Sequence, residues 1–481
     1  MTGTVLIYAI HRMEGWWRHI GDHMGFDHAV VLTDRRGKGD RWVTDDFYAA
    51  YENFRTNSGA RDALLAPAEI TDIIARCRVL RWLPTDQATA MAQAMATAME
   101  RVLDTVRPTV VTGFPIDSYV SDVLARRARA RGIPYFEVTA SALPGMCMLM
   151  HRGRLINSDV EADAGAVETR IREIAAPVFT PTYVQNQAPF TRARFLRTFW
   201  RFRLRGWVFK AVSWLKRDPL NLHYLDAQSS LGHKPQLSDI RVIDMVQADW
   251  KARVQTFPRD RRVLFGLQLL PEAAIDYWVD DLAMVRHEDM LVEAARHLVV
   301  DGFIVVVKDH PLQFGFRQTE LLSRLSALPN VVIAPYEVSG NEMLATCGVS
   351  LTATGTLGLQ AALLGLKSVT AEAYYVPNEQ DFIVLKTWHG LSVLPHRLHE
   401  TMLPADLYGR QARIVARLLQ GSFDADFFCF QGFDDRSPDE TTAELGRQLG
   451  ARLRLLGPDG ENWHGRHMPR GGGGHDGSPL R

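Results

Sequence analysis

The sequence predicts an α/β protein with two doubly wound, parallel-sheet domains. Three observations carry this prediction. Short apolar strands alternate with helices in both halves of the chain, as in βαβ units. The run Ile304–Val307 is continuously β-branched, which fits a strand buried on both faces. The length of 481 residues exceeds one ordinary core and suggests two to three domains.

The N-terminal half is predicted to form the first parallel sheet. Its expected strands are Val5–Ile10, His28–Thr33, Thr109–Thr112 and Ile133–Val138, with a polar loop over Asp34–Asp46, a turn over Gly113–Asp117 and a helix over Ser118–Arg131. Ligands of such sheets bind beyond the carboxyl ends of the strands. Side chains that directly follow these strands are therefore candidate site residues.

The segment Phe190–Arg217 (FTRARFLRTFWRFRLRGWVFKAVSWLKR) has the most unusual composition in the chain. Arginine and lysine alternate there with phenylalanine and tryptophan on a predicted helix. This mixture suits the headgroup region of an anionic membrane. A helix packed on its own domain, with its arginines in solvent, is the alternative. No RNA- or DNA-binding motif accompanies the segment, so no nucleic-acid partner is expected.

The C-terminal half contains two strand ends that suit an anionic ligand. The strand Ile304–Val307 runs directly into Lys308, Asp309 and His310. A second strand over Val349–Thr354 turns at Gly355 and Thr356 and continues as an apolar helix. The backbone N–H groups at a helix N-terminus and the positive end of its dipole attract phosphate. Neither segment is a P-loop or a G-x-G-x-x-G fingerprint.

The order of these motifs resembles a known family. The segments Gly266–Glu272 (GLQLLPE), KDHP, Asn330–Ile333 and ATGTLGLQAALLG look like the C-terminal half of the capsular polysaccharide biosynthesis family. These are bacterial GT-B glycosyltransferases, which include enzymes that transfer Kdo from a CMP-linked donor. The resemblance covers about Arg262–Val376 and is much looser over the N-terminal half. It implies two Rossmann-like domains that face across a cleft.

The resemblance also implies roles for individual residues. Lys308 and His310 match the family's Lys-x-His-Pro motif, which contacts the donor's phosphate or sugar carboxylate. Gly355 and Thr356 match the turn that cradles donor phosphate. The remaining expected donor-side positions are Gln268 and Glu272, with Pro271 between them, and Gln360, which stands where relatives usually have a glutamate. An amide still hydrogen-bonds ribose hydroxyls but lacks a carboxylate's charge, which leaves UDP- and GDP-sugars open as donors.

Catalytic candidates in the N-terminal half follow two predicted strands. Glu137 resembles the family's acidic position after a Gly-Ile-Pro strand, and would serve as general base, nucleophile or transition-state stabiliser. A surface ion pair is the alternative for this residue. His11, at the end of the first strand, is the second candidate.

Composition argues for a globular protein without a resident metal. The chain is 46% apolar and 23% charged, and its formal net charge is zero. The four cysteines form no C-x-x-C pair and suit reduced, buried thiols. His19 and His23 lack the glutamate of an H-E-x-x-H motif, and the Asp424-Ala-Asp426 spacing is interpreted as a turn or helix cap. No signal peptide or membrane span is predicted, which favours the cytoplasm, peripheral at the inner face of its membrane if the basic segment binds lipid.

These inferences define the expected organisation. An N-terminal Rossmann-like acceptor domain (1–160) precedes a helical basic-aromatic connection (161–260) and a C-terminal Rossmann-like donor domain (261–435). A helix (436–469) that braces the first domain and a disordered glycine-rich tail (470–481) complete the chain.

The expected function is metal-independent transfer of a sugar, with Kdo a candidate, from a nucleotide donor to a capsular or surface polysaccharide or its lipid-linked acceptor. No cofactor beyond the nucleotide-sugar substrate is expected. A CDP-glycerol-type glycerophosphotransferase and a non-hydrolysing sugar-nucleotide epimerase share the fold and remain alternatives. So does a non-catalytic carbohydrate-binding or assembly protein.

Overall fold

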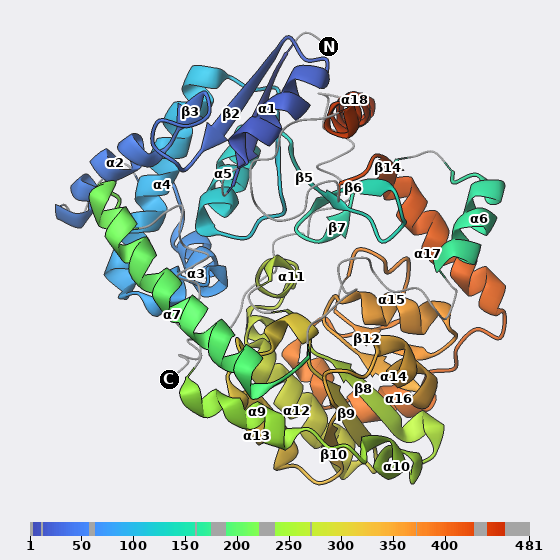
Figure 1. Ribbon diagram of the computed structural model, residues 1–481. Coiled ribbons are helices and arrows are strands. Elements are labelled where there is room, and N and C mark those ends of the chain that lie inside the picture. Colours follow the sequence, from blue (N-terminus) through green and yellow to red (C-terminus); the bar gives the residue numbers. More distant parts are fainter. Residues whose placement is uncertain are drawn as a thin grey trace.

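Two α/β domains face each other in the computed structural model (Figure 1). The structure describes residues 3–10, 13–56, 63–158, 161–174, 189–220, 236–269, 272–371, 373–427 and 440–456. Each domain is built on a largely parallel sheet with helices packed against it, as the alternating pattern predicts. The arrangement is that of a GT-B fold.

The N-terminal domain contains an eight-stranded sheet in the order β14-β6-β5-β4-β1-β2-β3, with β7 paired to β6. Strands β1 to β5 pair in parallel, whereas β6 runs antiparallel to β5, β7 and β14. The strands are β1 (Thr4–Ala9), β2 (His28–Thr33), β3 (Arg41–Trp42), β4 (Val110–Gly113), β5 (Tyr135–Ala140), β6 (Met146–His151), β7 (Arg154–Leu155) and β14 (Ser422–Asp424).

The helices of this domain are α1 (Glu14–His23), α2 (Thr44–Thr56), α3 (Pro67–Arg76), η1 (Leu80–Trp82), α4 (Thr85–Val106), α5 (Tyr119–Ala130) and α6 (Ala164–Ile174). One difference from the sequence prediction is local. The polar stretch Asp34–Asp46 is not only a loop, because β3 lies within it and α2 starts at Thr44. Leu32 and Thr33 pair with Arg41 and Trp42, a tertiary contact that polar composition does not reveal.

The C-terminal domain contains a six-stranded, fully parallel sheet in the order β10-β9-β8-β11-β12-β13. Both faces of its central strands are buried: Val305 packs in one apolar cluster and Val306 in another on the opposite face. This explains why the strand is continuously apolar. The strands are β8 (Arg262–Gly266), β9 (Ile304–Lys308), β10 (Val331–Ile333), β11 (Val349–Leu351), β12 (Lys367–Thr370) and β13 (Ile383–Val384).

Helices of varied length follow in this half of the chain, and the last of them also packs on the N-terminal domain. They are η4 (Leu237–Arg241), α9 (Val242–Met245), α10 (Trp250–Gln255), η5 (Arg259–Arg261), α11 (Ala273–Asp276), η6 (Leu282–Val285), α12 (His287–Val300), η7 (Pro311–Gln313), α13 (Thr319–Ser326), α14 (Gly340–Thr346), α15 (Thr356–Leu363), η8 (Trp388–Leu391), α16 (Leu394–Glu400) and α17 (Leu407–Gly421).

Two helices pack along the outside of the molecule. The basic-aromatic segment forms α7 (Arg192–Leu215), which lies across both domains (Figure 1). The late helix α18 (Glu440–Leu455) returns to the N-terminal domain and packs on α1. Gly446 and Gly450 permit this approach, because a Cβ at either position would overlap the carbonyl oxygens of Ile20 and Met24.

The domains also meet through a cluster of arginines around α11. Arg76 of α3 donates hydrogen bonds to the carbonyl oxygens of Asp276 and Val279, at 2.9 and 2.7 Å. Arg78 and Arg81 bind the Asp276 carboxylate at 2.8 and 3.0 Å. Arg76 and Arg78 are buried, so these contacts are shielded from solvent. The N-terminal domain therefore fixes the position of α11, at the edge of the cleft.

Candidate functional site

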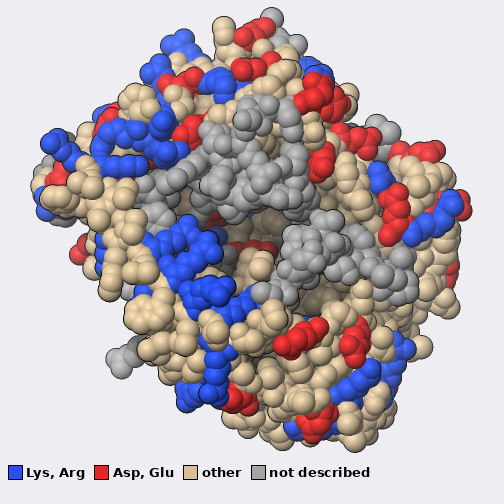
Figure 2. Space-filling view, in the orientation of Figure 1, with Lys and Arg blue, Asp and Glu red and all other residues tan. Residues whose placement is uncertain are grey.

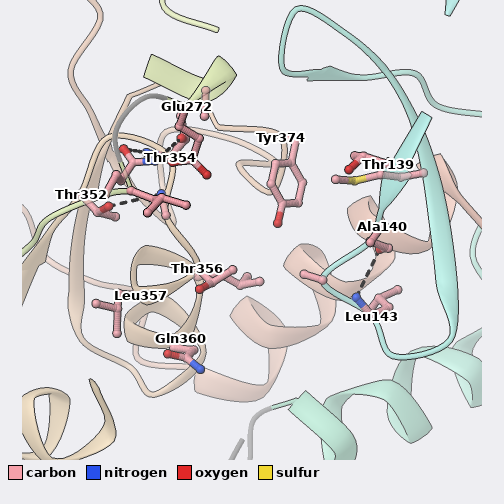
Figure 3. Close-up of a pocket in the computed structure, with 18 of the residues that line it drawn as sticks. Thr139, Ala140, Leu143, Glu272, Thr352, Thr354, Thr356, Leu357, Gln360 and Tyr374 are labelled. Carbon is pink, nitrogen blue, oxygen red and sulfur yellow. Dashed lines mark hydrogen bonds between the residues drawn. The ribbon is translucent and has the colours of Figure 1, made fainter. Parts of the chain in front are cut away.

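A cavity of about 610 Å³ lies between the two domains, at the carboxyl ends of the C-terminal sheet. Its two walls have different origins (Figure 3). Glu272, Thr354, Thr356 and Gln360 line the C-terminal side. The N-terminal side is a continuous stretch, residues 139–146, with Met148, and Tyr374 projects between the walls.

Gln268 organises the polar wall. Its amide oxygen accepts the backbone N–H of Thr354 at 3.2 Å, and its amide nitrogen donates to the Thr354 hydroxyl at 2.9 Å and to Glu272 Oε2 at 3.1 Å. One side chain thereby joins the loop after β8 to the loop after β11. The sequence predicted a strand as far as Thr354, whereas β11 ends at Leu351. Thr352 still donates its backbone N–H to Val369, but the backbone N–H of Thr354 bonds to the Gln268 side chain.

Glu272 is the acid–base candidate on this wall. It occupies the N-cap position of α11, whose far end is held by the arginine cluster. Burial raises the pKa of Glu272 to about 7, although the hydrogen bond from Gln268 and the charge of Arg78 both act to lower it. A carboxyl group with a pKa near neutrality can both accept and return a proton. The sequence led us to expect only that Glu272 shapes the crevice.

The N-terminus of α15 lies at the cavity, where the N–H of Gly355 donates to the Thr352 hydroxyl and the N–H of Gly358 donates to the Gly355 carbonyl oxygen. Gly355 is the N-cap and has no side chain to accept from the first N–H groups of the eight-residue helix. Gly355 and Thr356 both line the cavity, as does Gln360 one turn later. A Cβ at position 355 would lie 2.7 Å from the Thr352 hydroxyl oxygen, so a larger residue would displace that side chain. The turn therefore suits an anion held by backbone N–H groups.

His310 contributes a further donor to the same wall. Its Nδ1 accepts the backbone N–H of Leu312 at 3.2 Å, which places the proton of the neutral ring on Nε2. Burial lowers the pKa of His310, so the neutral form predominates at pH 7. The residue lines the cavity, as predicted from its place after β9. A neutral imidazole in this tautomer donates one hydrogen bond.

Lys308 does not line the cavity, contrary to the expectation that it contacts the donor. Its side chain is buried, and its Nζ donates to the carbonyl oxygens of Asp309 and Tyr336 at 2.9 and 3.3 Å. Burial lowers the pKa of Lys308 to about 8. Asp309 in turn accepts from Tyr336 and Arg317 at 2.5 and 2.8 Å. The first two residues of the KDHP motif therefore brace the loop that presents the third.

Glu137 is also placed away from the cavity, contrary to the expectation that it faces the acceptor. It is fully buried, and its two oxygens accept the backbone N–H groups of Ile116 and Arg152 at 3.1 and 2.5 Å. Burial raises the pKa of Glu137 to about 7. Its contacts join the loop after β4 to the turn between β6 and β7, which is a structural role. His11 and Pro271 lie outside the described residues.

The opposite wall is mainly apolar and was not predicted. Leu143, Met146 and Met148 face Leu359 and Leu363 across an apolar cluster that both domains share. Side chains of this kind carry no chemical signature in a sequence. Two further residues that line the cavity, Tyr374 after β12 and Asp426 after β14, follow strands. Their position after a strand is a signal from which the sequence could have predicted them. Asp426 was interpreted as part of a turn or cap.

The charge of the cavity is lower than the motifs suggested. Among the described lining residues, the ionisable side chains besides the Tyr374 phenol are Glu272, His310 and Asp426, and no lysine or arginine is present. Among these described residues, N–H dipoles are the groups that could meet negative charge on a ligand. Within the described parts of the chain, no group of three or more His, Cys, Asp or Glu side chains could hold a metal ion. No helix in those parts is long and apolar enough to cross a membrane.

Comparison with known proteins finds only remote similarity. No protein-family model and no curated protein matches the sequence. Among solved structures, the beta Kdo 2,4 transferase KpsC of Thermosulfurimonas dismutans is 13% identical with a TM-score of 0.32, over 73% of this chain and 88% of that one. A Neisseria meningitidis UDP-GlcNAc 2-epimerase bound to UDP-GlcNAc is 10% identical with a TM-score of 0.27, over 86% and 94% of the chains. Similarity this remote does not distinguish a transferase from an epimerase.

Proposed function

We propose that the protein is a glycosyltransferase that uses a nucleotide-sugar donor in the cavity between its domains. The observation that carries this proposal is the pairing, on one wall, of an uncapped helix N-terminus with a carboxyl group whose pKa is about 7. The first suits a phosphate group and the second suits proton transfer. A sugar transfer from a nucleotide can use the first to hold the leaving phosphate and the second to take the proton of the acceptor hydroxyl.

The donor nucleotide would lie against α15. The N–H groups at the start of the helix and the Nε2–H of His310 would hold the phosphate next to the sugar. During transfer, the bond from the anomeric carbon to the phosphate oxygen breaks, and the nucleotide leaves with that electron pair. Fixed dipoles that already point at the leaving oxygen stabilise the developing charge without rearrangement. This would allow transfer without a metal ion.

The acceptor hydroxyl would approach from the N-terminal wall. Its oxygen forms the new bond to the anomeric carbon, and its proton passes to the Glu272 carboxylate. The arginine contacts to α11 hold Glu272 at the edge of the cleft, within reach of ligands from both domains. The apolar wall formed by Leu143, Met146 and Met148 would exclude water, which otherwise competes as acceptor.

The finer assignment follows the resemblance to capsular polysaccharide enzymes. The proposed acceptor is a capsular or surface polysaccharide or its lipid-linked precursor, and Kdo is a candidate sugar. Gln360 lines the cavity beside the phosphate turn, where it would bind donor hydroxyls through its amide.

A donor panel tests the proposal. Purified protein and membrane extract would be incubated with CMP-, UDP- and GDP-sugars and with CDP-glycerol, and nucleotide release and polymer labelling would be measured. We expect release and sugar labelling with one nucleotide-sugar. Labelling from CDP-glycerol would identify a glycerophosphotransferase instead. Interconversion of the sugar without an acceptor would identify an epimerase. If every donor stays intact, the protein is not an enzyme of this class.

A further inference from the structure

Helix α7 has two apolar faces on opposite sides. One face packs against the protein, and the other is exposed. On the inner side, Phe195 and Phe199 are buried, and Phe195 lies against Phe314 of the C-terminal domain with ring centroids 6.2 Å apart. At the other end of the helix, the Lys216 carbonyl oxygen accepts a hydrogen bond from Arg36 of the N-terminal domain at 2.9 Å. These contacts attach α7 to both domains.

The outer side carries an exposed apolar stripe. Trp200, Trp207 and Trp214 recur every seven residues, which places them on one side of the helix. Their exposed fractions are 53, 66 and 77%. The same stripe contains four exposed aliphatic side chains, Leu196, Leu204, Val208 and Leu215. Single exposed apolar residues are ordinary, but a continuous stripe of this size marks a contact surface.

Basic residues follow both edges of the stripe. Along one edge they recur every four residues, at Arg197, Arg201 and Arg205. Along the other edge lie Arg203 and Lys210, which are seven residues apart. The helix contains no aspartate or glutamate. Figure 2 shows lysine and arginine gathered over α7, with uncharged residues beside them, on the face where the molecule is hollowed between its domains.

We propose that this outer face of α7 binds the surface of an anionic membrane. Tryptophan and aliphatic side chains would enter the boundary between headgroups and acyl chains, and the flanking arginines and lysine would contact anionic headgroups. Cationic edges without a single acid complement a uniformly anionic surface, which a bilayer that contains anionic lipid presents. Because α7 rests on both domains, binding would hold the cleft beside the bilayer, where a lipid-linked acceptor is found. The surface itself does not depend on the proposed transferase activity.

Vesicle binding of the full-length protein tests this inference. Co-sedimentation would compare vesicles of phosphatidylcholine alone with vesicles that also contain phosphatidylglycerol, at low and high salt. We expect binding to the anionic vesicles only, weakened by salt. Replacing Arg197, Arg201 and Arg205 with serine should weaken binding on the order of a hundredfold, since each basic residue near such a surface contributes roughly fivefold. Replacing Trp200, Trp207 and Trp214 with serine should also abolish most binding.

Matched variants control for charge and for exposed tryptophan. Arg101, Arg172 and Arg296 are exposed on other helices, and their replacement with serine removes the same charge elsewhere. Trp82 is 56% exposed outside α7 and serves as the tryptophan control. Both controls should bind vesicles like the original protein. Quenching of its tryptophan fluorescence by brominated lipid gives a second reading that needs no variant. Absence of quenching, equal binding to neutral vesicles, or a dimer that buries α7 would overturn the inference.

Discussion

Glu137 is fully buried in the N-terminal domain and Glu272 is half-buried in the C-terminal domain, and desolvation raises the pKa of each to about 7. Their surroundings differ. Both oxygens of Glu137 accept backbone N–H groups inside the N-terminal domain, and no part of the residue reaches solvent. Glu272 accepts a hydrogen bond from the side-chain amide of Gln268 and lines the cavity. A raised pKa therefore reports burial in both cases, and access to the cavity separates the candidate base from the structural carboxyl.

The largest expected effect follows from Glu272→Gln. Glutamine keeps the size of the side chain but cannot take up a proton, so kcat should fall by about 10²–10⁴. Transfer assays with the donor identified in the panel would measure this. Glu379→Gln is the matched control, because Glu379 is exposed and forms an ion pair with Lys386 away from the cavity. If the Glu272→Gln variant keeps its activity, Glu272 does not accept the proton.

His310→Asn should lower kcat by about 10- to 100-fold, which is the usual effect of losing one hydrogen bond to a charged group. Asparagine can still accept the Leu312 N–H and so keep the start of η7. It cannot present the Nε2–H to the cavity. Comparison with His310→Ala separates the two contributions, since alanine loses both. If both variants have the kcat of the original protein, the imidazole does not contact the donor.

The pH dependence of transfer should identify the base. If the carboxylate of Glu272 accepts the acceptor proton, kcat should rise with pH through about 7 and then level off. The measurement is a pH–rate profile of the original enzyme and of Glu272→Gln. The variant should lose this rise. An unchanged profile in the variant would assign the titration to another group.

Glu137→Gln should affect stability rather than transfer. In the variant, the glutamine side-chain NH₂ would face a backbone N–H where the carboxylate oxygen now accepts a hydrogen bond. The loss of that hydrogen bond should lower the free energy of unfolding by about 1–3 kcal/mol. Because the folded-state pKa of Glu137 is raised from 4.5 to about 7, the unfolded chain loses its proton first as pH rises. Stability of the original protein should therefore fall between about pH 4.5 and 7, and fall less in the variant. Denaturant unfolding at pH 5 and pH 8 measures this, and a large loss of kcat per folded molecule would contradict it.

Chelation of divalent metal ions should have the smallest effect on the transfer rate. Backbone N–H groups and His310 are proposed to stabilise the leaving phosphate, so transfer should continue at an unchanged rate in EDTA. Added Mg²⁺ or Mn²⁺ after chelation is the control. Restoration of a lost activity by either ion would show that a metal assists departure of the nucleotide.

Part of the site could be predicted because its signals are local. A buried strand followed by Gly355 and Thr356 and an apolar helix dictates a helix N-terminus at the sheet edge, and the structure has one there. The same holds for His310 after β9. Lys308 shows the limit of such reasoning. A lysine next to a strand end has the same local signature whether it points to ligand or, as here, to two carbonyl oxygens.

The sequence by itself determined the alternation of strands and helices, the two largely parallel sheets and the turn at Gly355 and Thr356, because periodicity and turn chemistry depend on neighbouring residues. Only the tertiary structure decided which glutamate reaches the cavity and that Lys308 does not. It also decided which side of α7 remains exposed. Each of these depends on contacts between residues far apart in the chain, such as Arg152 with Glu137 or Arg76 with α11. Burial and access arise from such contacts, and no local pattern encodes them.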